Sequence, residues 1–214
     1  EGGGSGEMMG VDDGGVPVTL EASGLIDLPS TGEPHRIVVR SLSLPVDVRR
    51  VLYPELGGCA HYAVKGVLRS ADPLLAGPAH VARENSFVGR TRVDFVAAGE
   101  PFELGVGPDE GIRVRREVKM EREKTAVLGT QTITRSVFVF VSNLSDERRS
   151  VFVVERVPVS EVEAVKVRVV ESRGWSWDER DGFLSMELDL GPRETRELEL
   201  TWEARAGADV VLPF

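Results

Sequence analysis

Most of the chain alternates apolar and polar residues with a period of two, which is the pattern of β-strands that bury one face. The clearest alternations cover residues 102–106, 112–120, 165–169, 184–190 and 198–202. Strands of this kind pair in antiparallel sheets, with one face against the core and the other in water. Residues 136–141 are apolar on both faces and predict a central strand.

Turn residues separate these alternating runs at regular intervals. They occur at Gly57-Gly58, Asp181-Gly182, Gly191-Pro192 and residues 143–146. About twelve strands fit between them, at the spacing of roughly 8–12 residues that is typical of sandwiches and barrels. Convincing amphipathic helices are absent. Residues 117–124 have helical propensity, but their alternation favours a strand.

The turn-rich residues 107–111 predict a boundary between two β-units. Residues 1–15 hold seven glycines among acids and methionines and predict a flexible tail or linker. Residues 16–108 would form the first unit, residues 109–206 the second and residues 207–214 a C-terminal tail. The second unit has the size of an immunoglobulin-like β-sandwich, without the cysteine pair of antibody domains. We expect an all-β fold of two antiparallel β-units, the C-terminal one immunoglobulin-like, and the two units can share a sheet.

The charge of the chain argues against nucleic acid as a partner. The net charge is −9 at pH 7, and it is spread evenly. Residues 1–108 carry nine basic and 14 acidic side chains, and residues 109–214 carry 17 and 21. Proteins that bind duplexes usually have a basic patch or stripe. The longest apolar runs have about five residues, against about 20 for a membrane-spanning helix, so we expect no membrane span.

The single cysteine, Cys59, cannot form a disulfide within the chain. It favours a cytoplasmic location weakly, with the cell envelope as the alternative. Zinc sites need about four close Cys or His ligands, and Cys59 and His61 are the only close pair beside His35 and His80. We therefore expect no metal and no cofactor. A catalytic triad is a spatial arrangement, so a hydrolase with an unrecognised site stays open, although no Gly-x-Ser-x-Gly motif is present.

Several short stretches, taken in order, resemble a known family. They are Tyr53-Pro54, residues 60–63, 73–78, 86–90, 99–109 and 156–161, and residues 190–194. The series, over about residues 35–206, is similar to the C-terminal domain of mucoidy-inhibitor-A-like proteins, also called the domain of unknown function 4139. The resemblance implies an all-β domain that follows an N-terminal β-domain and a coiled coil. The family name implies a bacterial protein linked to exopolysaccharide regulation, and it supplies no catalytic residue or cofactor.

One segment is rich in aromatic and charged side chains and is the candidate ligand-binding site. It contains Arg173, Trp175, Trp177, Asp178 and Arg180. In an extended segment the two tryptophans would share a face, where aromatic rings with charged neighbours can stack on a sugar or grip a peptide. The alternative is that one or both tryptophans fill the end of the sandwich core.

These observations lead to three hypotheses about function. The first is a non-enzymatic binding or scaffolding module for a protein partner, acting through its loops or an exposed strand edge. The second is a carbohydrate-binding module that uses Trp175 and Trp177 on a glycan. The third is the hydrolase considered above.

The apolar residues 210–214 would dock on their own domain or, alternatively, on a neighbour.

Overall fold

The computed structural model describes residues 19–20, 22, 24–125 and 129–212, and all regular elements among them are β-strands. The prediction of an all-β fold is therefore confirmed. The strands are β1 (Val46–Leu52), β2 (Cys59–Val67), β3 (Gly77–Arg83), β4 (Ser86–Val93), β5 (Pro101–Thr125), β6 (Thr130–Asn143), β7 (Arg149–Arg156), β8 (Val165–Glu171), β9 (Ser176–Asp178), β10 (Phe183–Leu190) and β11 (Thr195–Gly207). Residues 117–124 lie in β5 and are strand, as their alternation predicts.

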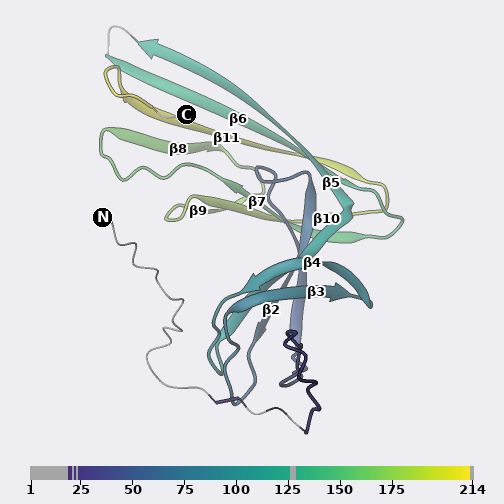
Figure 1. Cartoon of the computed structure of the whole chain (residues 1–214). Coiled ribbons are helices and arrows are strands. Elements are labelled where there is room, and N and C mark those ends of the chain that lie inside the picture. The colour runs from purple at the N-terminus through teal and green to yellow at the C-terminus, as the bar shows by residue number, and fades with distance from the viewer. Residues whose placement is uncertain (1–18, 21, 23, 126–128, 213–214) are drawn as a thin grey trace, which may run out of the picture.

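Nine of these strands form one sheet in the order β8-β11-β6-β5-β2-β1-β7-β10-β9, and β3 and β4 form a separate hairpin. Neighbours in the sheet are antiparallel except β1 and β7, which pair in parallel through Val51–Phe152 and Leu52–Val153. The parallel pair joins the two predicted units into one sheet. In Figure 1 the sheet folds over, so that β5, β6, β11 and β8 lie above β7, β10 and β9.

Strand β5 runs through the predicted boundary at residues 108 and 109. Its first half pairs with β2 and its second half pairs with β6. Gly107 lies at a register shift in the pairing of β5 with β2, with a φ of +100°, and a Cβ there would lie 2.1 Å from Val88 Cγ1. Only glycine fits such a backbone beside a neighbouring side chain. The boundary thus falls inside a strand, and the division of the chain into domains stays a prediction.

The hydrophobic core lies between the two folded-over parts of the sheet. Alternate residues of β6, β7, β10 and β11 point into it, and β5 and β1 add Ile112 and Leu52. Leu212 is buried in the same cluster, so the described part of the C-terminal tail, up to residue 212, docks on its own domain. The predicted tail of residues 1–15 lies outside the described residues.

The immunoglobulin-like sandwich stays a prediction. Such a sandwich has two separate sheets. Here the hydrogen-bonded order continues from one part to the other through β5, β2 and β1.

Among the described residues, no helix is long and apolar enough to cross a membrane.

Candidate functional site

The five residues of the predicted ligand site lie close together in sequence but not on one surface. Trp175 is buried, with 8% of its surface exposed, and belongs to the core. Trp177 lies on β9 and is 38% exposed. Arg173, Asp178 and Arg180 are exposed. The two tryptophans therefore do not share an exposed face: Trp175 fills the core, as the alternative interpretation expects for one of them, and ligand binding by the exposed residues stays a prediction.

Trp175 is turned inward by a reverse turn that comes before β9. Its backbone N–H donates to the carbonyl of Ser172 at 3.0 Å, so the segment is not yet extended. Its indole Nε1–H donates to the carbonyl of Glu199 on β11 at 3.1 Å, which satisfies the polar end of the ring inside the core. At the C-terminal end of β9, the Asp178 carboxylate accepts hydrogen bonds from the backbone N–H groups of Arg180 and Asp181 at 3.1 and 3.3 Å. Asp178 therefore stabilises a turn.

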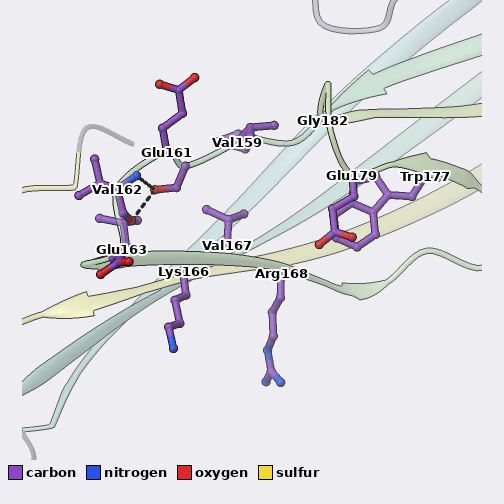
Figure 2. A pocket seen from close by; sticks show the side chains of 13 residues that line it. Val159, Glu161, Val162, Glu163, Lys166, Val167, Arg168, Trp177, Glu179 and Gly182 are labelled. Atoms are coloured by element: carbon purple, nitrogen blue, oxygen red, sulfur yellow. Dashed lines mark hydrogen bonds between the residues drawn. The ribbon is translucent and has the colours of Figure 1, made fainter.

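Trp177 forms part of the wall of an open groove of about 890 Å³, shown in Figure 2. The groove is bounded by residues 158–163, by the first half of β8, and by Trp177, Glu179 and Gly182. Strands β8 and β9 are the two ends of the nine-stranded sheet. The groove therefore lies where the two free edges of the folded-over sheet approach each other, and we call it the edge groove.

The free edge of β8 has backbone groups without a strand partner. Two hydrogen bonds show which residues of β11 bond to β6: Asn143 N–H donates to Glu194 C=O, and Ala208 N–H donates to Gly129 C=O. The even-numbered residues of β11 therefore bond to β6. Because antiparallel bonding alternates, the odd-numbered residues of β11 then bond to β8 through Lys166 and Arg168. The backbone N–H and C=O of Val167 consequently point toward the free edge.

The first residue of β8 supports this alternation. The N–H of Val165 also points away from β11, and it donates to the carbonyl of Val162 at 3.0 Å. That bond closes the turn that brings residues 158–163 over the groove. The Ser160 hydroxyl accepts the N–H of Val162 at 3.3 Å and holds the same turn.

The opposite end of this loop is fixed against the β9–β10 turn. The N–H of Val157 donates to the carbonyl of Gly182 at 2.8 Å. Gly182 has a φ of +73°, and a Cβ there would lie 2.4 Å from the Val157 carbonyl oxygen. The close approach requires glycine, so the wall of the groove is set by the backbone.

The lining of the edge groove is mixed: Val159, Val167 and Trp177 supply apolar surface, and acidic side chains lie at its ends. Val167 points into the groove, whereas Lys166 and Arg168 point away from it on the other face of β8 (Figure 2). Arg168 donates to Glu203 at 2.6 Å, and this hydrogen bond raises the pKa of the Arg168 guanidinium. Glu163 and Glu179 lie at opposite ends of the groove (Figure 2). Val162 and Val159 are exposed beside it.

The sequence analysis did not identify the groove residues on the loop and on β8. The sequence did contain a signal for the loop: Val159 and Val162 are apolar residues close to acids in a stretch without strand alternation, which is unusual for an ordinary surface loop. Val167 was recognised as a strand residue, but its edge position depends on its pairing with Ala204 of β11, which is 37 residues away in sequence.

The residues considered for metal or thiol chemistry do not gather. Cys59 is partly buried on β2, and His61 and His80 are exposed on β2 and β3. His80 contacts Phe87 edge to face, with 5.8 Å between the ring centroids. His35 lies in the exposed segment before β1. Within the described ranges there is no group of three or more His, Cys, Asp or Glu that could hold a metal.

Comparison with known proteins adds one match. The sequence profile of the domain of unknown function 4139 (DUF4139) matches residues 9–207. No curated protein matches the chain significantly. Because the profile covers most of the chain, and because the ordered short stretches quoted above fall within it, the protein belongs to the DUF4139 family.

Proposed function

We propose that the chain is a non-catalytic binding module and that its partner is an extended peptide that lies in the edge groove. The observation that carries the proposal is the free edge of β8, where the backbone N–H and C=O of Val167 point outward beside an open, partly apolar groove. A strand added to this edge would satisfy both groups with its own backbone. Its alternate side chains would enter the groove and meet Val159 and Trp177.

The geometry favours a peptide over a glycan. A sugar would stack on an aromatic ring, and Trp177 offers only one partly exposed ring because Trp175 is buried. A peptide also uses the backbone edge, which a sugar cannot pair with in register. Carbohydrate binding through Trp177 alone is the second candidate, because this ring separates the edge groove from a neighbouring hollow lined by Tyr53, Phe152 and Phe183.

We place the module in a bacterial protein linked to exopolysaccharide regulation, as the resemblance to mucoidy-inhibitor-A-like proteins implies. The peptide would then be a segment of another protein or of the same longer chain. In this role the module recognises and holds a partner and carries out no reaction.

The test is a selection of random peptides by display on the intact chain. We expect selected peptides to bind wild type, to bind Val167→Pro at least tenfold more weakly, and to bind Val167→Ala nearly normally. Proline removes the outward N–H but leaves the bonds of Lys166 and Arg168 to β11 in place. Peptides that bind Val167→Pro as well as wild type, or a selection that yields no binder, would contradict the proposal.

A second measurement does not depend on the proline variant being folded. In wild type, the amide of Val167 should exchange with solvent more slowly when a selected peptide is bound, because strand addition gives it a hydrogen-bond partner. The amide of Arg168 already bonds within the sheet and serves as the internal control. Unchanged exchange at Val167 would show that the peptide does not pair with β8. Saturable binding of oligosaccharides that is lost in Trp177→Ala would support the second candidate.

A further inference from the structure

Three inward-facing positions, one each on β5, β6 and β7, carry charge where the pattern calls for apolar residues. Arg116 follows Ile112 and Val114 on the inner face of β5, and Arg135 lies between Ile133 and Val137 on β6. The third position is Glu155, which follows Val151 and Val153 on β7. Charged side chains are costly to bury, so such positions indicate a specific role.

Arg116 and Glu155 neutralise each other. Arg116 Nε and Nη2 donate to the two carboxylate oxygens of Glu155 at 2.9 and 3.2 Å, which is a bidentate pair. The Glu155 side chain is fully buried. Burial raises the pKa of Glu155, and the hydrogen bonds from Arg116 only partly offset that effect. Arg135 takes no part in this pair.

Arg135 has a buried donor that the described residues do not satisfy. Its Nε is buried without a hydrogen-bond partner among them. Its guanidinium carbon lies 5.6 Å from the centroid of the Trp202 ring, so the group is stacked rather than ion-paired. Leaving a buried donor unsatisfied costs about 1–3 kcal/mol, more for a charged group. A carboxylate that enters the pocket reaches this donor when the guanidinium turns off the Trp202 ring, and the new hydrogen bond removes this cost.

Arg116 and Arg135 line a pocket of about 320 Å³ together with Arg156, Glu55 and Trp202. We call it the arginine pocket. Its three arginines face two carboxylates, Glu55 at the rim and the buried Glu155, so its net charge is +1 when both acids are ionised. A monoanion matches this charge. A phosphate dianion would be repelled by the two glutamates, whereas a carboxylate fits the planar arginine fork.

The arginine pocket and the edge groove share part of one wall. Pro158 and Val159 line both. A peptide in the groove could therefore place one side chain or its C-terminus in the arginine pocket. We infer that the arginine pocket binds a carboxylate of the partner peptide through Arg135, so that the peptide carries an Asp, a Glu or its C-terminus at the position that enters the pocket. The identity of the ligand as a peptide rests on the proposed function, and the carboxylate site itself does not.

The carboxylate site is tested first with sodium acetate, by following the side-chain Nε–Hε signals of arginine in NMR spectra. We expect the Arg135 signal to move saturably with acetate and to move much less with sodium chloride or phosphate at equal ionic strength. The Arg135→Lys variant keeps the charge but loses the fork, and its affinity for acetate should fall at least fivefold. Arg115→Gln, at an exposed position on the same β5, is the matched control. An Arg135 signal that does not respond to acetate would overturn the inference.

The peptide part is tested with the display selection. Peptides selected on wild type should be enriched in Asp or Glu at one position, or should need a free C-terminus. Replacing that carboxylate by its amide should weaken binding to wild type about tenfold and leave binding to Arg135→Lys almost unchanged. Selected peptides that need neither carboxylate would overturn the inference and leave the proposed function standing. An acetate response without any peptide binder would overturn the proposed function and leave the pocket as a site for small carboxylates.

Discussion

Arg149 Nη1 lies 2.6 and 2.8 Å from the two carboxylate oxygens of Asp109, which connects β7 to the bend of β5. Arg50 on β1 donates to the same carboxylate at 2.7 Å, and the N–H of Gly111 donates at 3.0 Å. Burial by itself raises the pKa of Asp109, but the hydrogen bonds, led by that from Arg50, outweigh it and hold the pKa below its ordinary value. The two arginines therefore favour the ionised form.

The Asp109 network predicts a loss of stability in acid. A carboxyl whose pKa is lower in the folded chain contributes stability above its unfolded pKa and loses it as the pH falls through the folded pKa. Urea unfolding at neutral pH should show Asp109→Asn destabilised by about 3 kcal/mol, since two arginines lose their partner. The difference between wild type and variant should shrink between pH 5 and pH 2. A constant difference over that range would contradict the assigned role.

Glu155 predicts the opposite dependence on pH. Burial raises its pKa above the ordinary value in the folded chain. Its contribution to stability is therefore complete below the unfolded pKa and is lost as the pH rises through the folded pKa. Relative to a Glu155→Gln variant, wild type should become less stable as the pH rises from 4 to 7. The measurement is the free energy of unfolding of both proteins at each pH. If wild type instead becomes more stable relative to Glu155→Gln as the pH rises, the effect of Arg116 on the pKa of Glu155 outweighs that of burial.

Removal of the Arg116–Glu155 pair as a whole should be tolerated better than removal of one partner. Glu155→Leu alone should cost about 3–5 kcal/mol, because it leaves Arg116 without its counter-charge. The double variant Arg116→Met/Glu155→Leu should recover most of this loss, because apolar residues then face the core. A double-mutant cycle by chemical denaturation measures the coupling, and additive costs would argue against a coupled pair.

The two tryptophans should separate stability from binding. Trp175→Ala leaves a cavity in the core and an unpaired carbonyl at Glu199, so it should cost about 3–5 kcal/mol. Trp177→Ala should change the free energy of unfolding by less than about 1 kcal/mol, as expected for a partly exposed residue at a sheet edge, and should weaken peptide binding. Thermal unfolding and peptide titration of both variants test this. Equal destabilisation by both substitutions would contradict the assignment.

The C-terminal tail offers a matched pair of neighbouring residues. Leu212 is buried in the core and Val211 is 89% exposed. Gln131 holds this segment by donating from Nε2 to the carbonyls of Gly207, at 3.1 Å, and Val210. Leu212→Ala should lower the free energy of unfolding by about 2–3 kcal/mol, whereas Val211→Ala should leave it nearly unchanged. Similar effects of the two substitutions would show that the tail does not dock.

The alternation of apolar and polar residues predicted most strands because each strand buries one face, and this rule is local. It indicated β8, β10 and β11 near their observed positions. It could not predict the parallel pair of β1 and β7, since that contact joins residues about 100 positions apart, such as Val51 and Phe152. Nor could it show that β5 passes through the turn-like residues 107–111 without ending.

The candidate site was predicted only in part, for the same reason. The period of two places Trp175 and Trp177 on one face only if both lie in a strand, but Trp175 closes the turn from Ser172 and β9 begins only at Ser176. The arginine pocket was missed although a signal was present. Arg116, Arg135 and Glu155 each interrupt an otherwise apolar face, and their convergence becomes visible only once the strand order is known.

The position of β11 between β6 and β8 has a consequence for how the chain is made. A ribosome releases β6 and β8 well before β11, yet neither can complete its pairing until residue 207 has emerged. Until then the inner faces of β6 and β8 stay exposed in the nascent chain, which is the condition in which chaperones bind. The edge groove, which needs β8 in place, is therefore among the last parts of the molecule to form.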